Sequence, residues 1–174
     1  MVRAGAPPVA LNPASPLARL LDGPVRPGVV RWIGLRPARR APMVAVDRVV
    51  LDPVAGVVGD RWQGSPGGSR MVTLIAEEHL LAIGSFLGHS VTPEQLRRNI
   101  VVGGVNLLAL KERLLRVGTA VLEVTGECHP CSRMEQELGP GGFNAVRGQG
   151  GVTARVVSAG QLSVGEAISR LPAT

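Results

Sequence analysis

The chain has only two cysteines, and they stand three positions apart in the motif Cys128-His-Pro-Cys131. Ser132, the expected N-cap of a helix, follows directly, and Glu135 comes three positions later, which is the spacing of a capping box. The first turn of a helix carries partial positive charge and free N–H groups, which favour the thiolate form of a nearby cysteine. Because the thiolate attacks electrophiles and binds soft metals, we single out Cys131 as the candidate catalytic residue and metal ligand.

The same motif is compatible with other roles. A thioredoxin-like redox pair expects a long helix after the second cysteine, whereas the helix expected over 132–138 is barely two turns long. A structural zinc site needs four ligands, and the motif offers at most three close together: Cys128, His129 and Cys131. An inert buried thiol remains the ordinary alternative to these reactive roles.

Arginine supplies nearly all of the positive charge, with 18 residues against one lysine and a formal net charge of +6. The guanidinium group presents five donors in a planar fork that suits phosphates and carboxylates. Several arginines stand beside other polar residues at the ends of expected strands. The candidate cofactor-binding residues are Arg39, Asp60, Arg61, Arg70, Arg97, Arg98 and Asn99. Taken singly, each arginine is also compatible with a solvated surface charge, and Asp60 with a local turn hydrogen bond.

The composition argues against two large classes of ligand. Single-stranded nucleic acids are bound on aromatic stacking surfaces, but this chain has two Trp, two Phe and no Tyr, and no more than two basic residues in a row. A pyridoxal phosphate enzyme needs a lysine for its Schiff base. The single lysine, Lys111, lies in a stretch typical of the surface, so pyridoxal phosphate is not expected to act in this chain alone. A small anionic ligand is favoured over nucleic acid.

The cellular setting is predicted from what the sequence lacks. No apolar run approaches the roughly 18 residues of a membrane-spanning helix, and the N-terminus has no apolar core typical of a secretory signal. We therefore expect a cytoplasmic protein without a membrane partner, in which both cysteines stay reduced.

These side chains must be positioned by a strand-rich scaffold. Strands are expected at 28–35, 43–51, 70–75, 100–102, 119–125, 152–157 and 165–168, and short helices at 76–87, 92–95 and 132–138. The Gly-rich stretch 139–151 is expected to be a loop. The pattern predicts a mainly β fold, a sandwich or barrel with a few peripheral helices. We expect one domain over 28–174, preceded by a flexible Pro-rich segment over 1–27.

Seven segments of this sequence, in their order, resemble the MOSC domain, the C-terminal module of molybdenum-cofactor sulfurases. They are the strand Gly28–Ile33, Arg36-Pro37, Gly59-Asp60-Arg61, Arg97–Gly103, Leu115–Thr125, Pro130-Cys131 and Gly151–Ile168. The resemblance covers the chain from about Gly28 to Leu171. It implies a MOSC-type β-barrel and a molybdenum cofactor, molybdopterin.

The resemblance also implies roles for individual residues. Cys131 would ligate molybdenum or carry sulfur as a persulfide. Arg97, with basic residues near Arg39 and Arg61, would hold the phosphate of the pterin. Many members of the family have a histidine where this chain has Trp62, so a proton-transfer role at that position is in doubt.

Three functions follow as hypotheses. The first is the reduction of N-hydroxylated compounds with Cys131 as molybdenum ligand and electrons from an external donor. The second is a sulfur-carrier module that receives a persulfide on Cys131 from a cysteine desulfurase. The third is a cofactor-binding module without catalysis.

Overall fold

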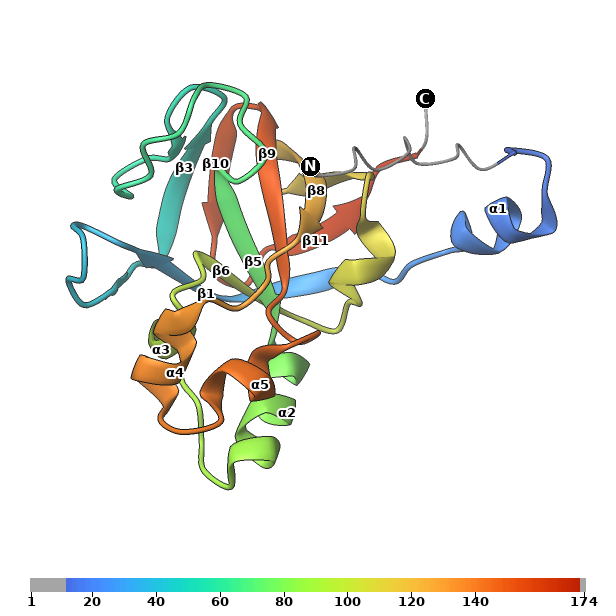
Figure 1. The fold of residues 1–174 in the computed structure, drawn as a ribbon. Helices are drawn as coiled ribbons and strands as arrows, with labels where there is room; N and C mark the ends of the chain where they lie inside the picture. The colour runs from blue at the N-terminus through green and yellow to red at the C-terminus, as the bar shows by residue number, and fades with distance from the viewer. Residues whose placement is uncertain (1–11, 173–174) are drawn as a thin grey trace, which may run out of the picture.

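A closed β-barrel forms the body of the protein, and the computed structural model describes residues 12–172 (Figure 1). The barrel strands are β1 (Gly28–Leu35), β5 (Val72–Ala76), β6 (Ile100–Gly103), β7 (Leu114–Val117), β8 (Ala120–Glu127), β9 (Val152–Ser158) and β11 (Ala167–Arg170). Their order is β1-β11-β7-β8-β9-β5-β6, and the ring closes because β1 pairs with both β11 and β6. The predicted fold class, mainly β with a barrel and few short helices, is confirmed.

A smaller sheet lies beside the barrel. It consists of β3 (Arg48–Asp52) between β4 (Gly56–Val57) and β10 (Gly160–Ser163). The short strand β2 (Val44–Ala45) pairs with the end of β1. Leu51 and Leu162 are fully buried and join the core of the barrel.

Two of the helices connect the strands of one parallel pair. Among the paired strands of residues 12–172, β5 and β6 alone run parallel, and parallel neighbours need a crossover connection rather than a tight turn. The chain crosses through α2 (Glu77–Leu87) and α3 (Pro93–Leu96). After β8, α4 (Ser132–Leu138) and α5 (Gly142–Val146) gather beside them below the barrel (Figure 1).

Strands β5 and β6 separate two hydrophobic cores. Leu74 belongs to the barrel core, whereas the next residue, Ile75, belongs to the cluster beneath the helices. In β6, Val101 faces the helices and Val102 faces the barrel. Both faces of these strands are covered, which explains why β5 lacks the alternation of a half-exposed strand and is buried throughout.

Several elements differ from the expectation. The expected strand 43–51 divides into β2 and β3, and the short strands β4, β7 and β10 were not predicted. The 3₁₀ helix η1 (Leu107–Leu110) was also missed, and α5 forms inside the expected Gly-rich loop. Helix α1 (Pro16–Leu21), capped by Ser15, projects from the barrel within the segment expected to be a flexible lead-in (Figure 1). Residues 1–11 of that segment lie outside the described residues.

The helices of residues 12–172 are too short or too polar to cross a lipid bilayer.

Candidate functional site

A buried hydrogen-bond network lies where β1 ends and β6 begins, and Asp60 is its centre. The Asp60 side chain has no exposed surface, and its Oδ1 accepts the backbone N–H of Arg36 at 2.6 Å. The guanidinium of Arg36 forks onto the same carboxylate, with Nε 3.0 Å from Oδ1 and Nη2 2.7 Å from Oδ2. Asn99 donates to Oδ1 at 3.2 Å, and its own Oδ1 accepts the hydroxyl of Thr73 at 2.9 Å. The network joins the residues after β1, after β4 and before β6.

A second buried arginine, Arg98, lies beneath the loop that carries the cysteines. Its Nε donates to the carbonyl of Gly150 at 2.8 Å, Nη1 to that of Leu96 at 2.8 Å, and Nη2 to that of Cys128 at 3.4 Å. A Cβ atom on Gly150 would lie 2.1 Å from the Cys128 carbonyl oxygen, so only glycine fits this close approach. Arg98 therefore ties together the backbone at the end of α3, after β8 and before β9.

The preceding residue, Arg97, adopts a left-handed backbone conformation with φ 56° and ψ 35°, which is uncommon outside glycine. It is the C-cap of α3, whose predicted capping box of Thr92 and Gln95 is confirmed. Its Nη1 donates to the carbonyl of Ala41 at 2.8 Å, which ties the β1–β2 loop to the site. The turn at Arg97 leaves its guanidinium partly exposed while that of Arg98 is buried.

Cys131 is exposed and occupies the N-cap position of α4. The expected capping box, with Ser132 as N-cap and Glu135 as its partner, is wrong. Ser132 is the first helical residue. The Glu135 carboxylate accepts the backbone N–H groups of Gly141 and Phe143 at 2.8 Å each, so it does not close a capping box. Cys128 is buried, and neither cysteine is in a disulfide.

Electrostatic effects on the two consecutive arginines show which charged groups surround them. Burial lowers the pKa of Arg97, the positive charges of Arg133 and Arg36 lower it further, and Glu137 opposes them. The charge of Arg61 also lowers the pKa of Arg97. The charges of Arg36, Arg61 and Arg133 are therefore near enough to Arg97 to act on it.

Arg98 shares this environment. Burial lowers its pKa, Cys128 and Cys131 act in the opposite direction, and Arg36 and Arg70 lower it further. We call the set Arg36, Arg61, Arg70, Arg97, Arg98 and Arg133 the arginine cluster. Gathering like charges in a partly buried place is unfavourable unless an anion balances them, so the cluster is suited to an anionic group beside Cys131.

The structure places the predicted site residues in three settings. Arg61, Arg70, Arg97 and Arg98 belong to the arginine cluster. Arg39 is exposed in the β1–β2 loop, which approaches the cluster at Ala41. Asp60 and Asn99, predicted to bind the cofactor, have buried side chains engaged by the protein itself, so they organise the segments that carry the arginines.

Arg36 was not among the predicted binding residues. Its Nε and Nη2 are held by Asp60, and within residues 12–172 its Nη1 makes no hydrogen bond to protein. The sequence feature that could have identified Arg36 as a binding residue is its position directly after the first expected strand and before Pro37. The sequence could not reveal that a carboxylate 24 residues away orients it.

A profile of the MOSC domain matches residues 55–169, which is more than half of the chain. This protein belongs to the MOSC domain family. The family is associated with molybdenum cofactor binding. The matched range of the MOSC domain contains Asp60 and Cys131, whereas Arg36 and Arg39 precede it.

Solved structures share this MOSC fold at low sequence identity. YuaD from Bacillus subtilis is 19% identical, with a TM-score of 0.71, over 83% of this chain and 96% of that one. YiiM from Geobacillus stearothermophilus is 16% identical, with a TM-score of 0.67, over 83% and 75%. YiiM from Escherichia coli is 17% identical, with a TM-score of 0.65, over 84% and 71%. These likenesses concern the fold alone, and no curated protein matches the chain significantly.

Proposed function

We propose that this MOSC protein binds the molybdenum cofactor and uses it to reduce N-hydroxylated compounds. The observation that carries the proposal is the arginine cluster beside the exposed thiol of Cys131. A pterin cofactor brings a phosphate that guanidinium groups bind well. It also brings a metal for which a thiolate is a suitable soft ligand.

The residues present fit such a group. Asp60 neutralises one guanidinium of the cluster, that of Arg36, and Glu137 pairs with Arg133 at 2.8 Å. Within residues 12–172, Arg97 and Arg98 form no salt bridge to a carboxylate. The cluster therefore keeps net positive charge for a multiply charged anion.

Individual residues then have distinct tasks. Arg36 would present its free Nη1 to the phosphate, and Asp60 holds it in place beforehand, so little side-chain freedom is lost on binding. Arg61 and Arg97 would complete the phosphate contacts. Cys131 would ligate the metal, and Arg98 would keep the loop before it in position.

The bound cofactor would supply a redox centre that accepts electrons and passes them to the substrate. Reduction of an N-hydroxylated compound consumes two electrons and two protons, breaks the N–O bond and releases water. The electrons must come from an external donor. Trp62, beside Arg61, offers no titratable group, so the protons are assigned to other groups or to solvent.

The test is native mass spectrometry on protein purified without oxygen from a molybdenum-replete host. We expect a non-covalent adduct with the mass of a molybdenum–pterin, with its molybdenum lost in Cys131→Ala. Arg97→Gln should lower the pterin occupancy by about tenfold, the effect of losing one charge-assisted hydrogen bond. The control is Arg116→Gln, because Arg116 is exposed on β7, outside the arginine cluster.

A wild-type chain with no more molybdenum or pterin than Cys131→Ala would contradict the proposal. The exposure of Cys131 favours a second function, because a sulfur donor can reach this thiol directly. In that case the purified chain would carry one extra sulfur atom on Cys131 after incubation with a cysteine desulfurase and cysteine. If none of the desulfurases tested transfers sulfur to Cys131, the sulfur-carrier function is excluded.

A further inference from the structure

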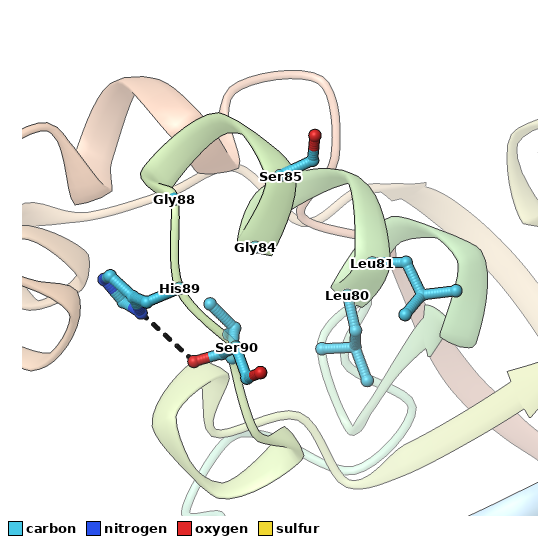
Figure 2. A pocket seen from close by; sticks show the side chains of 8 residues that line it. Leu80, Leu81, Gly84, Ser85, Gly88, His89 and Ser90 are labelled. Carbon is cyan, nitrogen blue, oxygen red and sulfur yellow. Dashed lines mark hydrogen bonds between the residues drawn. The ribbon is translucent and has the colours of Figure 1, made fainter.

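A groove runs between α2 and the segment of residues 88–91 that follows it. It has a volume of about 440 Å³ and is lined by Leu80, Leu81, Gly84, Ser85, Gly88, His89, Ser90 and Val91 (Figure 2). Leu81 is 71% exposed, and Phe86 on the other flank of the helix is 65% exposed. From residue 80 to residue 91 the sequence contains no Asp, Glu, Lys or Arg. Contiguous exposed apolar surface of this kind marks interaction sites on soluble proteins.

Helix α1 presents a complementary apolar face. Leu17, Leu20 and Leu21 have the i, i+3, i+4 spacing of one helix face, and all three are exposed, Leu20 at 78%. None of the six residues of α1 is buried. An isolated helix of this length is unstable in water, yet this one is capped by the Ser15 hydroxyl. Such a helix needs a surface against which to pack.

The arm that carries α1 is fixed to the barrel at its base. Arg170 donates to the carbonyls of Asp22 and Gly23 at 3.2 and 3.1 Å and pairs with the Asp22 carboxylate. Arg113 lies 3.5 Å from the same carboxylate. Held at this base, α1 points away from the helices below the barrel, so it does not reach the α2 groove of its own copy (Figure 1).

We propose that α1 of one copy docks its leucine face into the α2 groove of a second copy, and that the exchange is reciprocal. An apolar helix face laid into an apolar groove is a common mode of recognition. Reciprocal exchange of one arm closes a two-fold dimer with two identical contacts. The inference does not depend on the proposed chemistry.

Charge supports the choice of occupant. The described part of the arm up to Leu21 carries one charged side chain, Arg19, while α2 opens with Glu77 and Glu78, both exposed. Glu77 pairs with Arg31 at 3.4 Å, whereas Glu78 forms no salt bridge within residues 12–172. Glu78 stands three positions before Leu81 and so shares its helix face. A positively charged leucine helix therefore meets an apolar groove with an acidic margin.

The experiment measures the oligomeric state of the full chain by sedimentation over a wide range of concentrations. We expect a dimer in the wild type, and dimerisation weakened roughly 10- to 100-fold in Leu20→Lys and in Leu81→Glu, because each places a charge in an apolar contact. Both positions are exposed in the single chain, so the fold should persist, as circular dichroism can verify. Val54→Glu, in the turn after β3, is the control, with an apolar side chain of similar exposure (63%).

Mixing the two variants decides which surfaces meet. An equimolar mixture of Leu20→Lys and Leu81→Glu should form a heterodimer at concentrations at which each variant alone is mostly monomeric. That pair keeps one intact arm-to-groove contact and sets Lys against Glu at the other. A monomeric wild type would overturn the proposal. So would a dimer that is unaffected by Leu20→Lys, or a mixture in which no heterodimer forms.

Discussion

Arg36 and Arg98 are both withdrawn from solvent, but they are accommodated in different ways. Arg36 is paired with the fully buried carboxylate of Asp60 in a two-pronged contact. Arg98 is only 7% exposed and meets backbone carbonyls alone. The pair of Arg36 and Asp60 has no net charge, whereas Arg98 and its carbonyl partners keep one positive charge.

The difference predicts how much each arginine contributes to the stability of the fold. Removing one partner of a buried ion pair leaves an uncompensated charge, which is more costly than removing a donor from neutral acceptors. Asp60 and Arg36 should therefore matter most for folding. Arg98 should matter less for folding than its deeper burial suggests, because its removal takes a donor from neutral carbonyls and strands no charge.

The largest effect is expected for Arg36→Met, which leaves the Asp60 carboxylate buried without its cation. We expect the free energy of unfolding in urea to fall by about 3–5 kcal/mol. The double variant Arg36→Met/Asp60→Asn should recover part of that loss, because it removes the unpaired charge as well. If Arg36→Met is tolerated better than Arg98→Met, the contrast between the two regions is incorrect.

Arg98→Met should have a smaller effect, because three carbonyls lose their donor but no charge is stranded. We expect a loss of about 1–3 kcal/mol in the same urea titration. The loop before Cys131 should also loosen, so the buried Cys128 thiol should react faster with a thiol reagent than in the wild type. Unchanged labelling of Cys128 would mean that Arg98 does not hold this loop.

Thr73→Val tests a neutral member of the network around Asp60. The hydroxyl of Thr73 donates to Asn99 Oδ1 at 2.9 Å and accepts the Asn99 N–H at 3.0 Å. That N–H also reaches the Thr73 carbonyl, so we expect a loss of only about 1 kcal/mol by thermal or urea unfolding. A loss as large as that of Arg36→Met would show that the hydroxyl, not the ion pair, dominates the network.

The smallest effect should come from Glu135, outside both regions. Hydrogen bonds from the backbone N–H groups of Phe143 and Gly141 lower the pKa of Glu135 below its usual 4.5. Folding thus favours the ionised form, and this contribution is complete above the usual pKa and is lost as pH falls through the lowered value. The protection of the Gly141 and Phe143 N–H groups, relative to the intrinsic exchange rate at each pH, should fall in acid, whereas in Glu135→Gln it should be low already at neutral pH. Equal protection in both proteins at neutral pH would argue against this role.

Much of the fold follows from local pattern. Strand β1 has the predicted bounds, because its β-branched run lies between Pro27 and Arg36-Pro37. Helix α3 begins at the predicted capping box, in which Thr92 is the N-cap. Helix α5 could not be predicted, because its first N–H groups are satisfied by Glu135 from the preceding helix. Strand β10 depends on pairing with β3, which lies more than 100 positions away. Strand β4 has only two residues and pairs with β3 across a short turn.

The sequence predicted candidate site residues by type, but not the direction in which their side chains point. The structure brings Arg61, Arg70, Arg97 and Arg98 into the arginine cluster, and their binding of an anion stays a prediction. A sequence does not indicate whether a polar side chain faces a ligand or the interior, and Asp60 and Asn99 face the interior. The importance of Arg36 depends on Asp60, a long-range contact without a local signature.

The left-handed conformation of Arg97 affects which residues position 97 can accept. Glycine would adopt φ 56° without the penalty, of order 1 kcal/mol, that a longer side chain incurs. Replacing Arg97 with Gly would relieve that strain while losing one hydrogen bond to Ala41 of similar size, so stability alone hardly favours arginine. A library of position-97 variants screened only for thermal tolerance should therefore accept glycine, whereas one screened for anion capture should reject it.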